Sequence, residues 1–197
     1  MRFVSITRRF ASVTLIAALA THFADVGSTR DVHCATLDLE VWRIEARPTQ
    51  YAVFCSKEPE ACDLSGEPII DWKTAWPYLE KTNREVNSDI TLVPDTIGEG
   101  SEECWEFPAD GSGDCEDFAL EKRRRLTKDG LPSASLTMAI VHHQVQFFPH
   151  AVLLVETTRG TWLLDNLFDE IVCWDAAPYR YERRERPDGK WERYVVP

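Results

Sequence analysis

Three side chains in the second half of the chain could together carry out nucleophilic catalysis: Cys115, His150 and Asp165. A thiol attacks a carbonyl carbon as its thiolate, which a helix N-terminus and a nearby imidazolium favour. A histidine can take the thiol proton and later protonate a leaving amine, and an aspartate can fix the tautomer and orientation of that histidine. This chemistry needs a fold that brings the three side chains together.

A helix is predicted to begin at the cysteine. The pattern runs from about Cys115 to Lys128, and Gly130 follows where a C-terminal cap belongs. Residues 123–125 are expected to turn largely outward, while one face of the helix holds Phe118, Ala119, Lys122 and Leu126. Before the helix, residues 94–113 combine proline and glycine with acidic residues and predict a long loop, a kind of segment that is often functional.

A strand pattern replaces the helical one after Pro132. Alternating residues predict strands over 136–141, 150–156 and 161–165, with a turn at residues 157–160 between the last two. A helix followed by an antiparallel meander indicates an α+β domain.

The hairpin formed by the last two strands decides whether the histidine and the aspartate meet. If the numbers of paired residues sum to 315 or 317, His150 and Asp165 project from the same face. That face would then meet the helix N-terminus at Cys115. A slip of one residue would put the two side chains on opposite faces.

Other segments give weaker signals. Residues 71–87 have near-helical apolar spacing, but Pro77 interrupts it, so this helix is either kinked there or starts late. Residues 21–50 show no clear period. Residues 179–190 are highly charged and are expected to cover the surface.

Each candidate catalytic residue also has a common structural role. A cysteine at a helix start is often structural, and an aspartate that ends a strand is often a turn residue. His142 and His143 compete with His150 for the role of base. The coincidence of three suitable residue types at these positions favours catalysis.

The first twenty residues have the pattern of a secretory signal peptide. Arg2, Arg8 and Arg9 precede an uncharged apolar run over residues 10–20, which ends in a small-x-small motif. The run is too short to span a bilayer, which needs about 20 apolar residues. We expect residues 1–20 to be removed, residues 21–197 to form a single domain, and no segment to insert into a membrane.

Composition narrows the class of partner. The 197 residues suit one domain, and a hydrophobic fraction of 44% is ordinary for a globular protein. Acidic residues outnumber basic ones by 33 to 22, a net charge of −11. Nucleic acids and anionic membranes attract basic surfaces, so general binding to either is excluded.

An exported chain with six cysteines is expected to contain disulfides. Cys55 and Cys62 flank a short polar segment and are predicted to form a local bridge. Cys104 with Cys173 is a candidate second pair, which would leave Cys34 free. Zinc is disfavoured because the sequence has no Cys-x-x-Cys pair and no matching histidine spacing.

The stretch Gly113-Asp114-Cys115-Glu116-Asp117, with His150-Ala-Val-Leu-Leu-Val and Leu164-Asp165-Asn166, resembles the bacterial transglutaminase-like cysteine proteinases. The similarity covers about residues 50 to 175. It implies a papain-like or transglutaminase-like core, with the nucleophile at the N-terminus of a helix packed on an antiparallel sheet. It also implies a triad of Cys115, His150 and Asp165.

The resemblance carries further expectations about cofactor and partners. Adhesin-releasing members of the family are periplasmic, bind Ca²⁺ beside the nucleophile and are sequestered by a membrane receptor for cyclic di-GMP. The matching carboxylates are Asp114, Glu116 and Asp117. Charge supports this expectation, since three carboxylates around a thiol oppose its ionisation unless a cation offsets them. Acidic residues in a first helical turn can also simply complement the helix dipole.

Three activities remain open at this point. The leading one is a periplasmic, calcium-dependent cysteine endopeptidase that acts on a protein substrate, with a large surface adhesin as the candidate. A transglutaminase-type acyl transferase would share the triad and the thioester. A non-catalytic peptide-binding module would keep the fold alone, and an intact triad counts against it.

Overall fold

The computed structural model describes residues 32–94 and 104–195. The expected signal peptide, residues 1–20, lies outside the described residues. In chain order the elements are β1 (Val41–Glu45), α1 (Thr49–Lys57), the 3₁₀ helix η2 (Pro59–Cys62), α2 (Trp72–Asp89), β2 (Thr91–Leu92), β3 (Ser112–Gly113), α3 (Cys115–Lys128), the 3₁₀ helix η3 (Ser133–Ser135), β4 (Leu136–His143), β5 (Pro149–Thr157), β6 (Gly160–Leu164), β7 (Val172–Cys173), β8 (Tyr179–Glu185) and β9 (Trp191–Tyr194).

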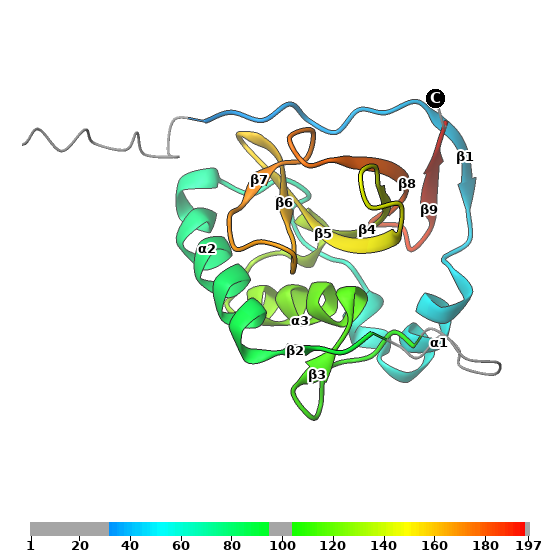
Figure 1. The fold of residues 1–197 in the computed structure, drawn as a ribbon. Helices are drawn as coiled ribbons and strands as arrows, with labels where there is room; N and C mark the ends of the chain where they lie inside the picture. Colours follow the sequence, from blue (N-terminus) through cyan, green and yellow to red (C-terminus); the bar gives the residue numbers. More distant parts are fainter. Residues whose placement is uncertain (1–31, 95–103, 196–197) are drawn as a thin grey trace, which may run out of the picture.

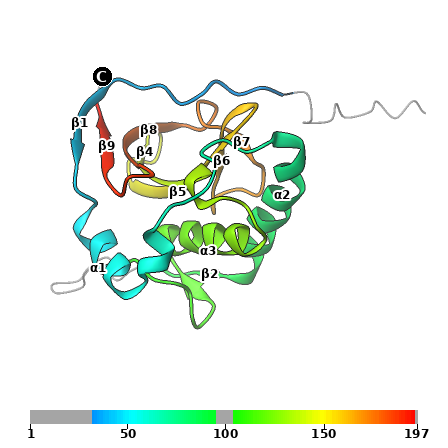
Figure 2. The ribbon, with the colours of Figure 1, turned by 180° about the vertical axis from the view of Figure 1, so that it is seen from behind.

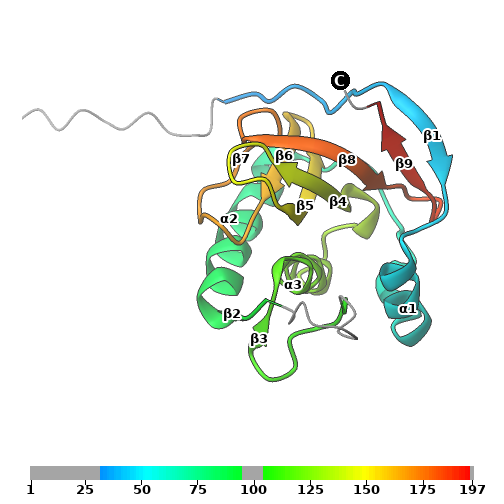
Figure 3. The same ribbon diagram turned by 45° about the vertical axis from the view of Figure 1, so that its right-hand side comes forward.

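A seven-stranded antiparallel sheet in the order β1-β9-β8-β4-β5-β6-β7 forms the centre of the molecule. Figures 1 and 3 show α3 under this sheet, with α2 on one side and α1 on the other. The layer between them is apolar and includes Leu79, Leu120, Leu126, Leu136, Met138, Leu153 and Val155. The predicted α+β class is confirmed, because the buried stripe of α3 needs the apolar face of the sheet to leave water.

The hairpin between β5 and β6 has one of the two predicted registers. Leu153 pairs with Leu164 and Thr157 with Gly160, so the paired numbers sum to 317. Gly160 has a φ of 88°, and a Cβ there would lie 2.0 Å from the carbonyl oxygen of Cys34. Only glycine suits both the turn and this close approach.

The chain before β1 covers the opposite face of the sheet. Residues 32–40, which we call the N-terminal strap, run across that face in blue in Figures 1 and 2. Its Leu37 packs in a second apolar cluster with Val141, Leu154 and Tyr181. The backbone N–H of Leu37 also donates to the Thr161 hydroxyl at 2.8 Å. The sheet is therefore covered on both faces.

Two disulfides join described residues. The predicted bridge between Cys55 and Cys62 is confirmed, although these residues lie on α1 and η2 rather than in an irregular loop. The candidate pair of Cys104 with Cys173 is wrong, because Cys173 is bonded to Cys34. The strap brings Cys34 beside the sheet edge at β7, a contact that no local pattern signals.

Peptide mapping without reduction is expected to recover two bridges, Cys34–Cys173 and Cys55–Cys62. The bonded residues are 139 positions apart in the first and seven in the second. Because the loop entropy removed from the unfolded chain grows with loop length, Cys34→Ser should lower the free energy of unfolding by about 5 kcal/mol and Cys62→Ser by about 2 kcal/mol. Urea unfolding measures both losses, and a peptide joining Cys104 to Cys173 would contradict the pairing.

The helix predicted within residues 71–87 is α2, and it starts at the beginning of that range. Asp71 caps α2 by accepting a hydrogen bond from the backbone N–H of Thr74 at 2.9 Å, and the helix begins at Trp72. Pro77 therefore lies inside the helix, and the alternative of a late start is wrong.

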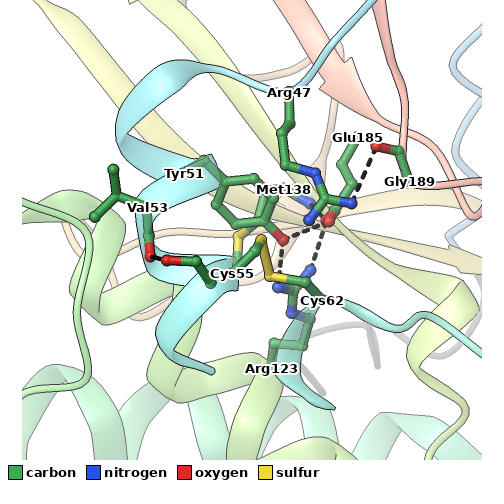
Figure 4. The surroundings of a disulfide bond; sticks show 10 residues. Arg47, Tyr51, Val53, Cys55, Cys62, Arg123, Met138, Glu185 and Gly189 are labelled. Atoms are coloured by element: carbon green, nitrogen blue, oxygen red, sulfur yellow. Dashed lines mark hydrogen bonds and ion pairs between the residues drawn. A yellow bond between two sulfur atoms is a disulfide. The ribbon is translucent and has the colours of Figure 1, made fainter. Parts of the chain in front are cut away.

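The charged segment over residues 179–190 was expected on the surface, and this prediction is wrong for its first part. Its first part is β8, which lies inside the sheet between β9 and β4. Its buried charges are paired: Arg184 donates to Glu156 at 2.5 Å, and Glu185 accepts from Arg123 at 2.5 Å. Arg123, also expected to turn outward, is buried between Glu185 and the Tyr51 hydroxyl, as Figure 4 shows beside the Cys55–Cys62 disulfide. Pairing makes the burial of these charges tolerable.

Candidate active site

The N-terminus of α3 is held by the side chain of Asp117, two residues after the candidate nucleophile Cys115. Asp117, in the first turn, accepts hydrogen bonds from the backbone N–H groups of Asp114 at 3.3 Å and Glu106 at 2.9 Å. A Cβ on Gly113 would lie 2.7 Å from an Asp117 oxygen, so glycine is required for this arrangement. These contacts of Asp117 fix where the helix begins.

The Cys115 thiol lies half-buried between α3 and β5. It donates to a Glu116 carboxylate oxygen at 3.1 Å and accepts the backbone N–H of Ala151 at 3.4 Å. Burial raises the pKa of the Cys115 thiol well above its ordinary value, and the Glu116 carboxylate raises it further. The Ala151 N–H acts in the opposite direction.

His150 and Asp165 form a buried pair. His150 Nε2 lies 2.8 Å from Asp165 Oδ1, and the side chains are 2% and 0% exposed. The same oxygen accepts the backbone N–H of Leu167 at 3.0 Å. Burial alone would raise the pKa of Asp165, but hydrogen bonds led by that from His150 hold it below its ordinary value. Ala151, the residue after His150, donates its backbone N–H to the Cys115 sulfur, so the His150–Asp165 pair lies beside the start of α3.

The two competing histidines have other partners. His142 Nε2 lies 2.6 Å from Glu182 at a partly exposed position. His143 Nδ1 accepts the backbone N–H groups of Val145 and Gln146, each at 3.2 Å, and so shapes the loop between β4 and β5. Both contacts explain these histidines without a catalytic role.

Lys122 lies two helical turns after Cys115, on the same side of α3. Its side chain is buried, and burial lowers its pKa to about 7 although Asp165 and Asp169 act to raise it. The Lys122 amine lies close enough to the Asp165 carboxylate for the two groups to interact electrostatically.

Carboxylates surround the thiol. Asp114, Cys115 and Glu116 each offer an atom that lies within 4.8 Å of the others. Glu116 is buried, and its Oε1 meets no hydrogen-bond partner among the described residues. Burial and the neighbouring Asp114 raise the pKa of Glu116 to about 9. Oxygen donors gathered in this way suit a hard cation such as Ca²⁺.

Asp117 is the third carboxylate expected to bind a metal, and it is already engaged in the structure. Both of its oxygens accept backbone N–H groups. Burial raises its pKa to about 7. Its position therefore couples the loop at Glu106 to the helix start next to the other two carboxylates.

A family model described as bacterial transglutaminase-like cysteine proteinase BTLCP matches residues 42–194. The chain belongs to this family. Membership makes it a cysteine peptidase with a transglutaminase-like fold, and it agrees with a cysteine at a helix N-terminus beside an antiparallel sheet.

Solved structures of LapG from Legionella pneumophila are similar to this chain. One is 30% identical over 60% of this chain and 68% of LapG, with a TM-score of 0.53. An EGTA-treated form is 29% identical over 61% and 68%, with a TM-score of 0.54. A calcium-bound form is 26% identical over 74% and 81%, also with a TM-score of 0.54. A comparison with curated proteins found no significant match.

Within the residues that the structure describes, no helix is long and apolar enough to cross a membrane.

One residue beside the site, Tyr179, was not predicted from the sequence to lie there. Tyr179 donates its hydroxyl to Asp165 Oδ2. The signal that could have found it is the alternation of Tyr179 and Tyr181 with charged residues, which is typical of a strand.

Proposed function

We propose that the chain is a calcium-dependent cysteine endopeptidase in which Cys115 is the nucleophile, His150 the general acid and base, and Asp165 the residue that orients His150. The observation that carries the proposal is the buried hydrogen bond between His150 and Asp165. The backbone N–H of Ala151, the residue after His150, donates to the Cys115 sulfur and so places this pair beside the thiol. A histidine oriented by a carboxylate beside a thiol at a helix N-terminus is the arrangement that thiol activation needs.

The proposed reaction has two stages. His150 takes the thiol proton, and the Cys115 sulfur attacks the carbonyl carbon of the scissile peptide bond. His150 then protonates the leaving amine, which departs and leaves a thioester on Cys115. In the second stage His150 takes a proton from water, which attacks the thioester and releases the acid and the free thiol. Asp165 accepts a hydrogen bond from the Nε2–H of His150, which leaves Nδ1 as the basic nitrogen.

Calcium is proposed to bind Asp114, Glu116 and Asp117. The proposal is supported by the buried Glu116 oxygen that meets no partner among described residues and by the raised pKa of Glu116. A bound calcium ion would offset the negative charge that opposes ionisation of Cys115. Asp117 would in addition keep the helix start in place through its backbone hydrogen bonds.

The location and partners proposed are those expected from the sequence. Residues 21–197 would be an exported, periplasmic domain that cleaves a large surface adhesin and is sequestered by a membrane receptor for cyclic di-GMP. Export is supported by the signal pattern of residues 1–20 and by two disulfides, since such bonds persist in oxidising compartments. The adhesin and the receptor are supported by the family resemblance.

Histidine substitutions test the proposed function. A proteome-derived peptide library read by mass spectrometry would first supply a cleaved peptide, and kcat/KM would then be measured on it. His150→Ala should lower kcat/KM at least about a thousandfold, because the thiol loses its base. His142→Ala and His143→Ala should retain most activity. A fully active His150→Ala, or an inactive His143→Ala, would overturn the assignment of the base.

A further inference from the structure

The Asp165 carboxylate is held on both oxygens. Its Oδ1 accepts hydrogen bonds from His150 and from the backbone N–H of Leu167. Its Oδ2 accepts the hydroxyl of Tyr179, which reaches it from β8. Tyr179 and Asp165 are 6% and 1% exposed, so water competes little for this contact. A carboxylate bonded on both oxygens cannot rotate without losing a partner.

The ring of Tyr179 also lies against the imidazole of His150. The ring centroids are 5.6 Å apart with an interplanar angle of 52°. The Tyr179 ring also lies near the His143 ring, with a centroid distance of 5.5 Å. The sheet fixes the phenol, because Tyr179 pairs with His143 in the ladder of β8 and β4. One side chain therefore contacts both members of the His150–Asp165 pair.

We infer that Tyr179 is a positioning residue for the reaction, which holds the Asp165 carboxylate so that Oδ1 faces His150 Nε2. This inference rests on the proposed function, in which Asp165 orients the catalytic histidine. The phenol has the properties that the role requires. Burial and the adjacent carboxylate raise the pKa of Tyr179, so its hydroxyl remains a donor throughout the neutral range.

Tyr181 offers a matched control on the same strand. It is 4% exposed, and its hydroxyl donates to the backbone oxygen of Trp174 at 2.9 Å rather than to the catalytic pair. Removing either hydroxyl leaves a buried phenyl ring in β8. A difference between the two variants therefore reports the contact with Asp165 and not the loss of a buried hydroxyl in general.

The test compares Tyr179→Phe with Tyr181→Phe on the cleaved peptide. Tyr179→Phe should lower kcat about tenfold or more with little change in KM, since a hydrogen bond to a charged group is lost from the machinery and not from the substrate site. Tyr181→Phe should keep kcat near that of the parent. In an Asp165→Ala background Tyr179→Phe should have no further effect, because the residue acts through that carboxylate. Equal losses of kcat in the two phenylalanine variants would overturn the inference.

A spectroscopic measurement gives a readout independent of turnover. The downfield proton NMR signal of the His150 Nε2–H should shift in Tyr179→Phe and stay unchanged in Tyr181→Phe. Should Tyr179→Phe not fold, 3,5-difluorotyrosine at position 179 keeps the ring and makes the hydroxyl more acidic. An unchanged signal and an unchanged kcat in that protein would overturn the inference.

The failures of the two proposals can be told apart. Full activity in Asp165→Ala would contradict the triad itself, and with it the role of Tyr179. An inactive Asp165→Ala together with a fully active Tyr179→Phe would contradict the role of Tyr179 alone.

Discussion

Replacing Cys115 by alanine is expected to leave the protein folded and to lower peptide cleavage by about three to six orders of magnitude, as for catalytic nucleophiles generally. The side chain lies at the start of α3 and donates to Glu116, so its removal takes away the attacking sulfur and little packing. Circular dichroism and thermal unfolding check the fold, and kcat/KM on the cleaved peptide checks the chemistry.

The second cysteine outside the two disulfides is the matched control. Cys104→Ala should retain activity, because Cys104 precedes the buried Trp105 and belongs to neither bridge. Iodoacetamide should label Cys115 much faster than Cys104 in the active protein, since the proposed base His150 would promote ionisation of the Cys115 thiol. Full proteolysis by Cys115→Ala, or recovery of Cys115 in a native disulfide, would contradict the assignment.

Removing calcium with EGTA is expected to abolish proteolysis, and calcium is expected to restore it where magnesium does not. At about 6 Å, one unit charge costs on the order of 3 kcal/mol at an effective dielectric constant of 20. This corresponds to roughly two pKa units on the Cys115 thiol. Glu116 and Asp114 both raise the pKa of that thiol, in addition to the larger effect of burial. Calcium tolerates irregular carboxylate ligands, whereas magnesium demands octahedral geometry.

A pair of variants distinguishes a specific calcium site from a general effect of acidic residues near the thiol. Glu116→Gln should raise the calcium concentration for half-maximal activity about tenfold or more, because one charge of the proposed ligand set is lost at a buried position. Asp110→Asn is the control, because this exposed carboxylate accepts a hydrogen bond from the Ser112 hydroxyl in the loop before Cys115 and its loss should leave the calcium requirement unchanged. Undiminished activity in EGTA, with no bound metal found by elemental analysis, would refute the requirement.

The elements that carry the proposed triad could be predicted because their signals are local. The helix begins at Cys115 and ends at Lys128 as expected, since glycine and loop residues precede it and Gly130 follows it. The hairpin register was limited to two values, and either one puts His150 and Asp165 on the same face. The structure has the value 317, and the two side chains are hydrogen-bonded.

Strand β8 was missed because charge hides its pattern. Five of its seven residues are charged, so composition indicates a surface segment. Two of those charges, Arg184 and Glu185, are buried and neutralised by Glu156 and Arg123, which lie on other elements. A pattern of hydrophobicity along one segment contains no information about such partners.

By itself the sequence determined the features whose partners lie close along the chain: Cys115 at a helix start, the shared face of His150 and Asp165, and the bridge from Cys55 to Cys62. Period-two alternation and helix end signals suffice for these, because each depends on the conformation of a short segment.

Only the tertiary structure decided which distant segments meet. The strap bonds Cys34 to Cys173, which is 139 residues away. Strand β8 pairs with β4 and β9 instead of extending the meander after β7, and this order brings Tyr179 to Asp165. Burial of the apolar face of the sheet by α3 and the pairing of buried charges select that arrangement, and both are properties of the whole packed domain rather than of any single segment.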